Sequence, residues 1–246
     1  MSKQNGMMKR IVKLSLILMM GASMSACSDS WKEEVLLHDG QKIIVKRAVE
    51  HGGRHELFQS PPISEQRLEW EMPGTGETII WEDHFSQDVG SATLLPMLVD
   101  VHQGNAYVVA NPTSCLAYNK WGRPNPPYVI FKHEGREWKR IPLQELPSEI
   151  RTPNLILSSP DEEAKQIGKN PVPAEAIQRI VRETFQPEYK SILREPVTKG
   201  SGGTSCAIPT TVAQELIAPK IDGVILRYNW WPLAQDWLEK KYGSNR

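Results

Sequence analysis

Between residues 33 and 141, apolar and polar side chains alternate in short runs separated by turn residues, a period of two that predicts β-strands. The clearest pair, 34–38 and 41–45, flanks Asp39 and Gly40, which tolerate positive φ and predict a type I′ hairpin turn. Connections this short exclude parallel crossovers, so the strands should pair antiparallel. The same pattern predicts further strand pairs at 68–72 and 78–81, at 94–101 and 106–110, and at 128–132 and 136–141.

After residue 150 the alternation gives way to helical periodicity. Ser159 followed by Pro160 and three acidic residues predicts the start of a helix, and Gly168 predicts its end. Residues 174–185 carry apolar side chains at spacings of three and four, which predicts an amphipathic helix. Beyond them, the patterns predict a flexible linker at 198–205, helices at 211–218 and 232–241, and a strand at 224–228.

We therefore expect an α+β fold. Its body, residues 33–150, should be rich in antiparallel β-hairpins, arranged as a sandwich or a meander. A smaller helical and mixed C-terminal segment, residues 151–246, should pack on this body.

Composition narrows the class of protein. The 246 residues are 39% hydrophobic and 24% charged, which excludes a collagen-like, coiled-coil or fully disordered chain. Lys plus Arg and Asp plus Glu are both 29, so the basic excess of a dedicated nucleic-acid binder is missing and no nucleic-acid partner is expected.

The first 26 residues differ from the rest of the chain. Lys3, Lys9, Arg10 and Lys13 form a positive region without an acidic residue, and an apolar run at 14–20 follows them. Small residues then lead to Ala26, which completes the layout of a secretory signal peptide. The alternative is a transmembrane anchor, but the run is too short and ends in small residues rather than a basic cluster.

The cleavage region Met24-Ser25-Ala26-Cys27 resembles the lipobox of bacterial lipoproteins, although Met24 stands where Leu is usual. The resemblance implies that the signal is cut before Cys27, whose thiol receives a diacylglycerol and whose new amine is acylated. Ser28 in place of the Asp of inner-membrane retention implies the periplasmic face of the outer membrane. Residues 27–32 would be a short tether. The alternative is an ordinary signal-peptidase site with Cys27 there by chance.

Anchoring would then depend on the acyl chains. Cleavage removes four basic residues and leaves 25 basic side chains against 29 acidic ones, so the mature body has little attraction for anionic lipid. Two acyl chains suffice for a stable anchor. The mature protein is therefore expected to bind the membrane through its acyl chains rather than through charge attraction.

Three cysteines are an odd number for an exported protein. If Cys27 is a thioether, as the resemblance implies, Cys115 and Cys206 are left as one possible disulfide, closing a loop of about 90 residues. The alternative is two separate buried thiols.

Two groups of side chains suggest chemistry. His51 and His55 have the spacing of metal ligands on one helix face, but Gly52 and Gly53 lie between them and favour a solvated loop. We expect neither a metal site nor a cofactor. Glu82, Asp83 and His84 combine carboxylates with an imidazole that they could orient as a general base. This group carries the alternative hypothesis of an envelope hydrolase, although residues 203–207 do not form the G-x-S-x-G nucleophile motif.

Residues 118–128 are the most unusual stretch, because aromatic rings, cations and three prolines lie together. Tyr118, Trp121, Arg123 and Tyr128 are residue types that dominate contact energies, so this loop is our candidate binding site. The alternative is a structural loop in which Trp121 covers the core. We expect a non-catalytic envelope lipoprotein that binds another envelope protein or cell-wall glycan through this loop.

Overall fold

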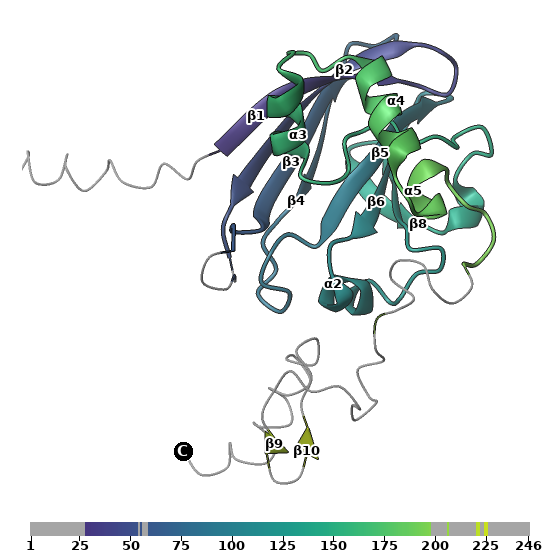
Figure 1. Ribbon diagram of the computed structural model, residues 1–246. Coiled ribbons are helices and arrows are strands. Elements are labelled where there is room, and N and C mark those ends of the chain that lie inside the picture. Colours follow the sequence, from purple (N-terminus) through teal and green to yellow (C-terminus); the bar gives the residue numbers. More distant parts are fainter. Residues whose placement is uncertain are drawn as a thin grey trace, which may run out of the picture.

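The structure is a computed structural model that describes residues 28–53, 55, 59–197 and 206, together with the backbone of 220–221 and 224–225. Two four-stranded antiparallel sheets follow one another along the chain, and short helices come mostly after them (Figure 1). The predicted α+β class with a hairpin-rich body is confirmed. The signal segment, Cys27, the linker and the two last predicted helices lie outside the described residues; Val224–Ile225 (β10) pairs with Lys220–Ile221 (β9).

Each main sheet is a meander in which neighbouring strands are also consecutive in sequence. The first contains β1 (Ser28–Leu36), β2 (Lys42–His51), β3 (Ile63–Glu71) and β4 (Thr78–Asp83). The second contains β5 (Leu94–His102), β6 (Asn105–Pro112), β7 (Val129–Glu134) and β8 (Glu137–Ile141). All four predicted strand pairs are present.

The turn between β1 and β2 differs from the predicted type I′ turn. The amide of Leu37 donates to Gln41 O at 2.8 Å, so the loop has three residues. Of these three, Gly40 alone has positive φ, at 86°. A three-residue loop with a left-handed glycine satisfies the same sequence signal, because Asp-Gly fits both loop lengths.

The two sheets pack their inner faces together as a sandwich. Alternation places every second side chain on that face, so each strand contributes to one shared core. The core is formed by Val35, Val45, Leu68, Trp70, Ile79 and Trp81 of the first sheet with Leu94, Val99, Ala106, Val108, Ala110 and Val129 of the second.

Short helices cover what the sandwich leaves open. The described helices are α2 (Cys115–Lys120), the 3-10 turn η1 (Leu143–Glu145), α3 (Pro160–Ile167), α4 (Ala174–Glu183) and α5 (Pro187–Lys190). Helices α3 and α4 lie against β1 (Figure 1). As predicted, α3 ends at Gly168, whose φ is 67°, but the Ser159 side chain makes no capping hydrogen bond.

Residues 151–193 complete the core rather than form an appendage. Leu155 belongs to the core between the sheets, and Ile192 packs on the other face of the second sheet. The buried amide of Asn154 donates to Leu36 O at 3.0 Å and to Val99 O at 2.8 Å, which joins one sheet to the other. The edge of β1 is also covered, since Glu34 N donates to Val172 O and Val172 N donates to Lys32 O.

A buried ion pair stands on the inner face of the first sheet. Arg47 Nη1 donates to Glu33 Oε1 at 2.9 Å, and both side chains are 1% exposed or less. Glu33 also accepts from Trp31 Nε1 at 2.8 Å and from Ile156 N at 3.2 Å, while Arg47 donates to Ile156 O at 2.7 Å. The guanidinium lies 5.2 Å from the centre of the Trp31 ring. Two strands and the 151–161 segment therefore meet at one pair of charges.

Removing one member of this pair should lower the stability of the protein strongly. We expect Arg47→Met to lower the free energy of unfolding by about 3–5 kcal/mol, because Glu33 would be left charged and buried. The matched control is Arg67→Met. Arg67 also pairs with carboxylates, Glu69 and Glu82, but its side chain is 38% exposed, so the loss should be about 0–1 kcal/mol. Urea denaturation of both variants measures the difference, and equal losses would contradict the prediction.

Candidate functional site

The candidate loop at 118–128 is largely folded inward. Tyr118 and Tyr128 are buried. The Tyr128 hydroxyl donates to Glu188 O at 2.9 Å and accepts from Leu193 N at 3.2 Å, and burial raises its pKa well above the ordinary value. Trp121 is half-buried, packs edge-on against Phe131 and donates to Thr93 Oγ1 at 3.1 Å. The aromatic rings of this loop thus tie the second sheet to its neighbours.

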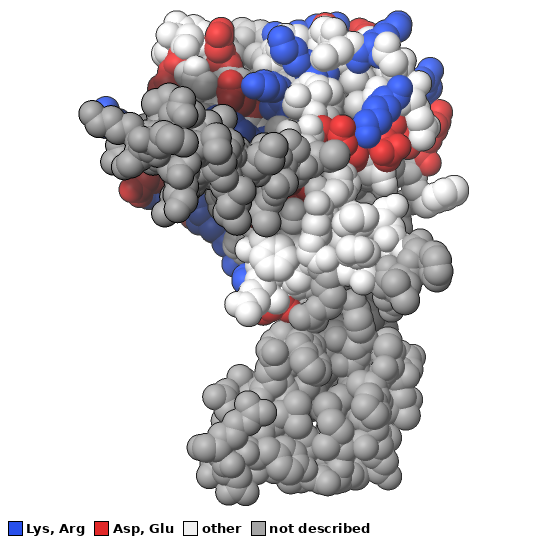
Figure 2. Space-filling model, turned by 90° about the vertical axis from the view of Figure 1, so that its left-hand side faces the viewer, with Lys and Arg blue, Asp and Glu red and all other residues white. Residues whose placement is uncertain are grey.

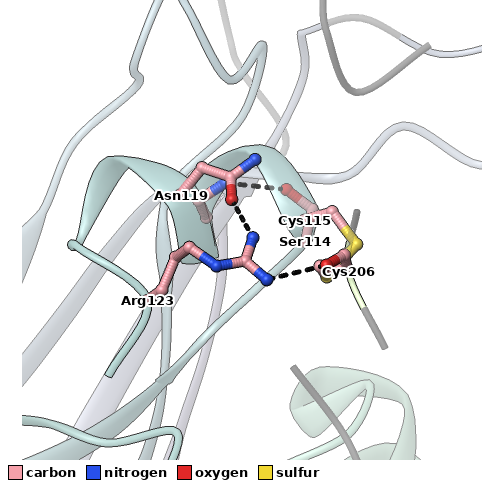
Figure 3. Close-up of a disulfide and its surroundings, with 6 residues drawn as sticks. Ser114, Cys115, Asn119, Arg123 and Cys206 are labelled. Atoms are coloured by element: carbon pink, nitrogen blue, oxygen red, sulfur yellow. Dashed lines mark hydrogen bonds between the residues drawn. A yellow bond between two sulfur atoms is a disulfide. The ribbon is translucent and has the colours of Figure 1, made fainter. Parts of the chain in front are cut away.

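Arg123 points back onto helix α2 and the disulfide (Figure 3). Its guanidinium donates to Asn119 Oδ1 and, at 2.7 Å, to the carbonyl of Cys206, and it lies 4.9 Å from the centre of the Tyr118 ring. Cys115, the first residue of α2, forms a disulfide with Cys206 across a Cα–Cα distance of 5.3 Å. These contacts attach residue 206 to the end of the second sheet.

The proline half of the loop lines a surface groove. Residues 124–126 and Tyr128 border a hollow of about 470 Å³ together with Arg140 and Leu143. A second hollow, of about 780 Å³, shares Leu143, Gln144 and Arg194 with the first. We call the two together the 124–151 groove. Tyr118, Trp121 and Arg123 do not line it.

Arg194 lines both hollows of this groove and fixes the backbone beneath them. Its guanidinium donates to four main-chain carbonyls, those of Leu143, Leu146, Pro147 and Ile150, at 2.7 to 3.3 Å. Burial, and secondly the charge of Arg151, lowers the pKa of Arg194. The groove is therefore shaped by a hydrogen-bonded cation. Arg140 and Arg151 are exposed residues that also line it, and their guanidinium groups donate to Trp121 O at 2.9 Å and to Ser148 O at 2.6 Å.

The Glu82, Asp83 and His84 group has a different arrangement from the one predicted. The side chain of His84 is 70% exposed, and its Nδ1 lies 2.7 Å from Glu65 Oε2 rather than beside Asp83. Asp83 accepts from Thr93 N at 2.7 Å and from Leu94 N at 2.8 Å, so it fixes the connection between the two sheets. Glu82 pairs with Arg67. The hydrolase hypothesis thus keeps an exposed imidazole with a carboxylate near each ring nitrogen, Glu65 at 2.7 Å and Glu82 at 3.8 Å, while Asp83 has a structural role.

The two histidines of the 51–55 loop diverge. His55 is exposed, and its Nδ1 lies 3.0 Å from Gly53 O. His51 ends β2 and lies near Asp29 and Asp161, with Nε2 at 3.0 Å from Asp161 Oδ2. Burial alone would lower the pKa of His51, but hydrogen bonds to Pro61 and Asp161 outweigh it and raise the pKa. The spacing of the two histidines therefore gave no indication that Asp29 and Asp161 lie near His51.

A second imidazole–carboxylate pair was also missed. His38 Nδ1 lies 2.6 Å from Asp100 Oδ1, and burial raises the pKa of that carboxyl. The His38 ring contacts that of His102, 5.3 Å between centres. The sequence held one signal for this pair, because Asp100 is a lone acid within the apolar run of β5.

Charged side chains of both signs lie next to each other on the side of the molecule shown in Figure 2. Ion pairs at the surface, such as Lys42 Nζ with Glu34 Oε1 at 2.6 Å, reflect this mixture of charges. Among the residues with a described structure, no helix is long and apolar enough to span a bilayer. Comparison of the chain with protein-family models, curated proteins and solved structures gave no match.

The contact with Glu65 predicts the titration of His84. The hydrogen bond to Glu65 raises the pKa of His84 above its ordinary value. The pair therefore stabilises the fold fully below about pH 6.5, and this contribution is lost as pH rises through the higher pKa of the folded state. We expect Glu65→Gln to lower the pKa measured by NMR.

Glu82→Gln is the matched control, since Glu82 Oε2 lies 3.8 Å from His84 Nε2 and should have a smaller effect. An unchanged pKa in Glu65→Gln would contradict the assignment.

Proposed function

We propose that this chain is the precursor of a lipid-anchored protein of the bacterial envelope, tethered by acyl chains on Cys27 to the periplasmic face of the outer membrane. Its role would be non-catalytic binding of another envelope protein. The proposal rests on the sequence before residue 28, where a positive region, an apolar run at 14–20 and small residues precede Cys27 in the layout of a lipoprotein signal.

An anchor on Cys27 would hold the body close to the bilayer. Residues 28–32, expected as a tether, belong to β1, and the amide of Lys32 donates to Asn170 Oδ1 at 2.9 Å. An acylated Cys27 would thus be joined to the sheet without a spacer. Two or more acyl chains would supply the affinity that the mixed surface charges do not.

The 124–151 groove is the surface that best supports binding. Prolines 124 and 126 and Leu143 give it rigid apolar walls, and Arg140 and Arg151 add positive charge at the rim. Preorganised walls lower the entropic cost of binding. An extended protein segment that carries carboxylates fits this chemistry.

Loss of the thiol should release the protein. In cells that export the native chain, we expect Cys27→Ser to move the protein from the membrane fraction to the soluble fraction or to leave the uncleaved precursor. Mass spectrometry of the native form should find residue 27 at the N-terminus with added acyl mass. A native protein that washes out of the envelope without added lipid mass would overturn the anchor.

Filling the groove should abolish binding without affecting the anchor. Gln144 is exposed and lines both hollows, so Gln144→Tyr should reduce cross-linking to the partner at least about tenfold, a penalty near 1.4 kcal/mol. Glu137→Tyr, exposed on β8 outside the groove, is the control. Equal capture by both variants would contradict the groove assignment, and capture by isolated cell wall alone would replace the protein partner by glycan.

A further inference from the structure

We propose that Asp29, His51 and Asp161 bind one divalent transition-metal ion, with Zn²⁺ as the best fit. One ligand atom from each residue lies within 4.8 Å of the other two. The three residues come from the start of β1, the end of β2 and the first turn of α3. The site is independent of the 124–151 groove, and its existence does not require the proposed function.

A hydrogen bond at Nδ1, the ring nitrogen that does not face Asp161, fixes the orientation of His51. Its Nδ1 lies 3.0 Å from the carbonyl of Pro61, which can only accept, so Nδ1 carries the proton. The lone pair of the neutral ring is then on Nε2, which faces Asp161 Oδ2 at 3.0 Å. A backbone carbonyl behind the imidazole is the usual outer support of a metal-binding histidine.

Two facing acceptors require a cation between them or a second proton on the ring. Ligand atoms about 2.1 Å from one ion lie about 3.0–3.4 Å apart for octahedral to tetrahedral angles. The observed separation of 3.0 Å is within this range. The pair therefore fits two ligands of a single ion as well as it fits a hydrogen bond from a doubly protonated ring, and the burial of Asp161 favours the ion.

The burial of Asp161 also indicates a cation at this place. Its side chain is 3% exposed, and Oδ1 is buried without a hydrogen-bond partner among the described residues. A buried carboxylate is costly unless its charge and its oxygens are compensated. His51 reaches only Oδ2, and Lys165 Nζ is 3.9 Å from that same oxygen. A bound dication would compensate the carboxylate more fully.

Lys165 is the built-in competitor. Its ammonium lies 3.1 Å from Asp29 Oδ2 and 3.9 Å from Asp161 Oδ2, so it neutralises the same two carboxylates that the ion would bind. The side chain is 53% exposed and can leave without disturbing the core. A hollow of about 220 Å³ lined by Asp29, Asp161, Lys165 and Gly168 gives an ion a path from solvent.

The donor set selects the class of ion. One imidazole nitrogen and two carboxylates suit Zn²⁺ and its first-row neighbours, whereas Mg²⁺ and Ca²⁺ prefer oxygen ligands alone. Three protein ligands also leave room for water on the ion, as in zinc sites with an open position.

Calorimetric titration of ZnCl₂ into the purified full chain, without a histidine tag, tests the site. We expect one ion per chain. Asp29→Asn and His51→Ala should each weaken binding by about 100-fold or more, while His55→Ala, an exposed histidine of the same loop, should leave it unchanged. Lys165→Met should tighten binding, because the competing ammonium is removed.

A spectroscopic readout separates coordination from loose association. Co²⁺ should give visible bands that disappear in His51→Ala, and circular dichroism should show that each variant is folded. Absence of binding by folded wild-type protein, or equal binding by wild type, Asp29→Asn and His51→Ala, would overturn the proposal. In the first case the cluster would be an imidazolium–carboxylate ion pair only, and in the second the ion would lie elsewhere.

Discussion

The fold depends on a buried charge pair that neither half of the chain could hold alone. Glu33 and Arg47 face the interior from adjacent strands, where desolvation costs several kcal/mol per ion unless every charge has partners. The partners come from Trp31 and from the backbone of Ile156, more than 100 positions away. The first sheet is therefore complete only when the 151–161 segment lies across it.

This constraint also positions the candidate metal site. Once Ile156 is bound to the ion pair, the chain leads directly into α3, whose first turn carries Asp161. The carboxylate then meets His51 at the end of β2 and Asp29 at the start of β1. Asp29 is two residues from Cys27, so a metal site here would lie beside the proposed lipid attachment. The ion pair and the candidate metal site thus share strand β1.

The candidate binding loop shows how composition can mislead about roles. Aromatic residues, arginine and proline in one loop suggested a recognition surface, but the rings of Tyr118 and Tyr128 are buried and Arg123 is directed onto Asn119 and Cys206. The prolines, in contrast, reach the groove wall. Nothing in the sequence distinguishes these two halves, because an aromatic ring suits a protein core as well as an interface.

The sequence by itself determined the local structure: four antiparallel strand pairs and two helices follow from alternation, helical periodicity and turn residues, which act over a few positions. It did not indicate that Asp29 and His51 share one end of the first hairpin, because residues 28–32 were expected to form a tether and His51 a loop, whereas both belong to the paired strands β1 and β2. Only the tertiary structure decided that two meanders form a sandwich, that Glu65 is the carboxylate in close contact with His84, and that Asp161 joins His51. Those contacts join residues 19 to 110 positions apart. They arise from burial and charge compensation, which no local pattern encodes.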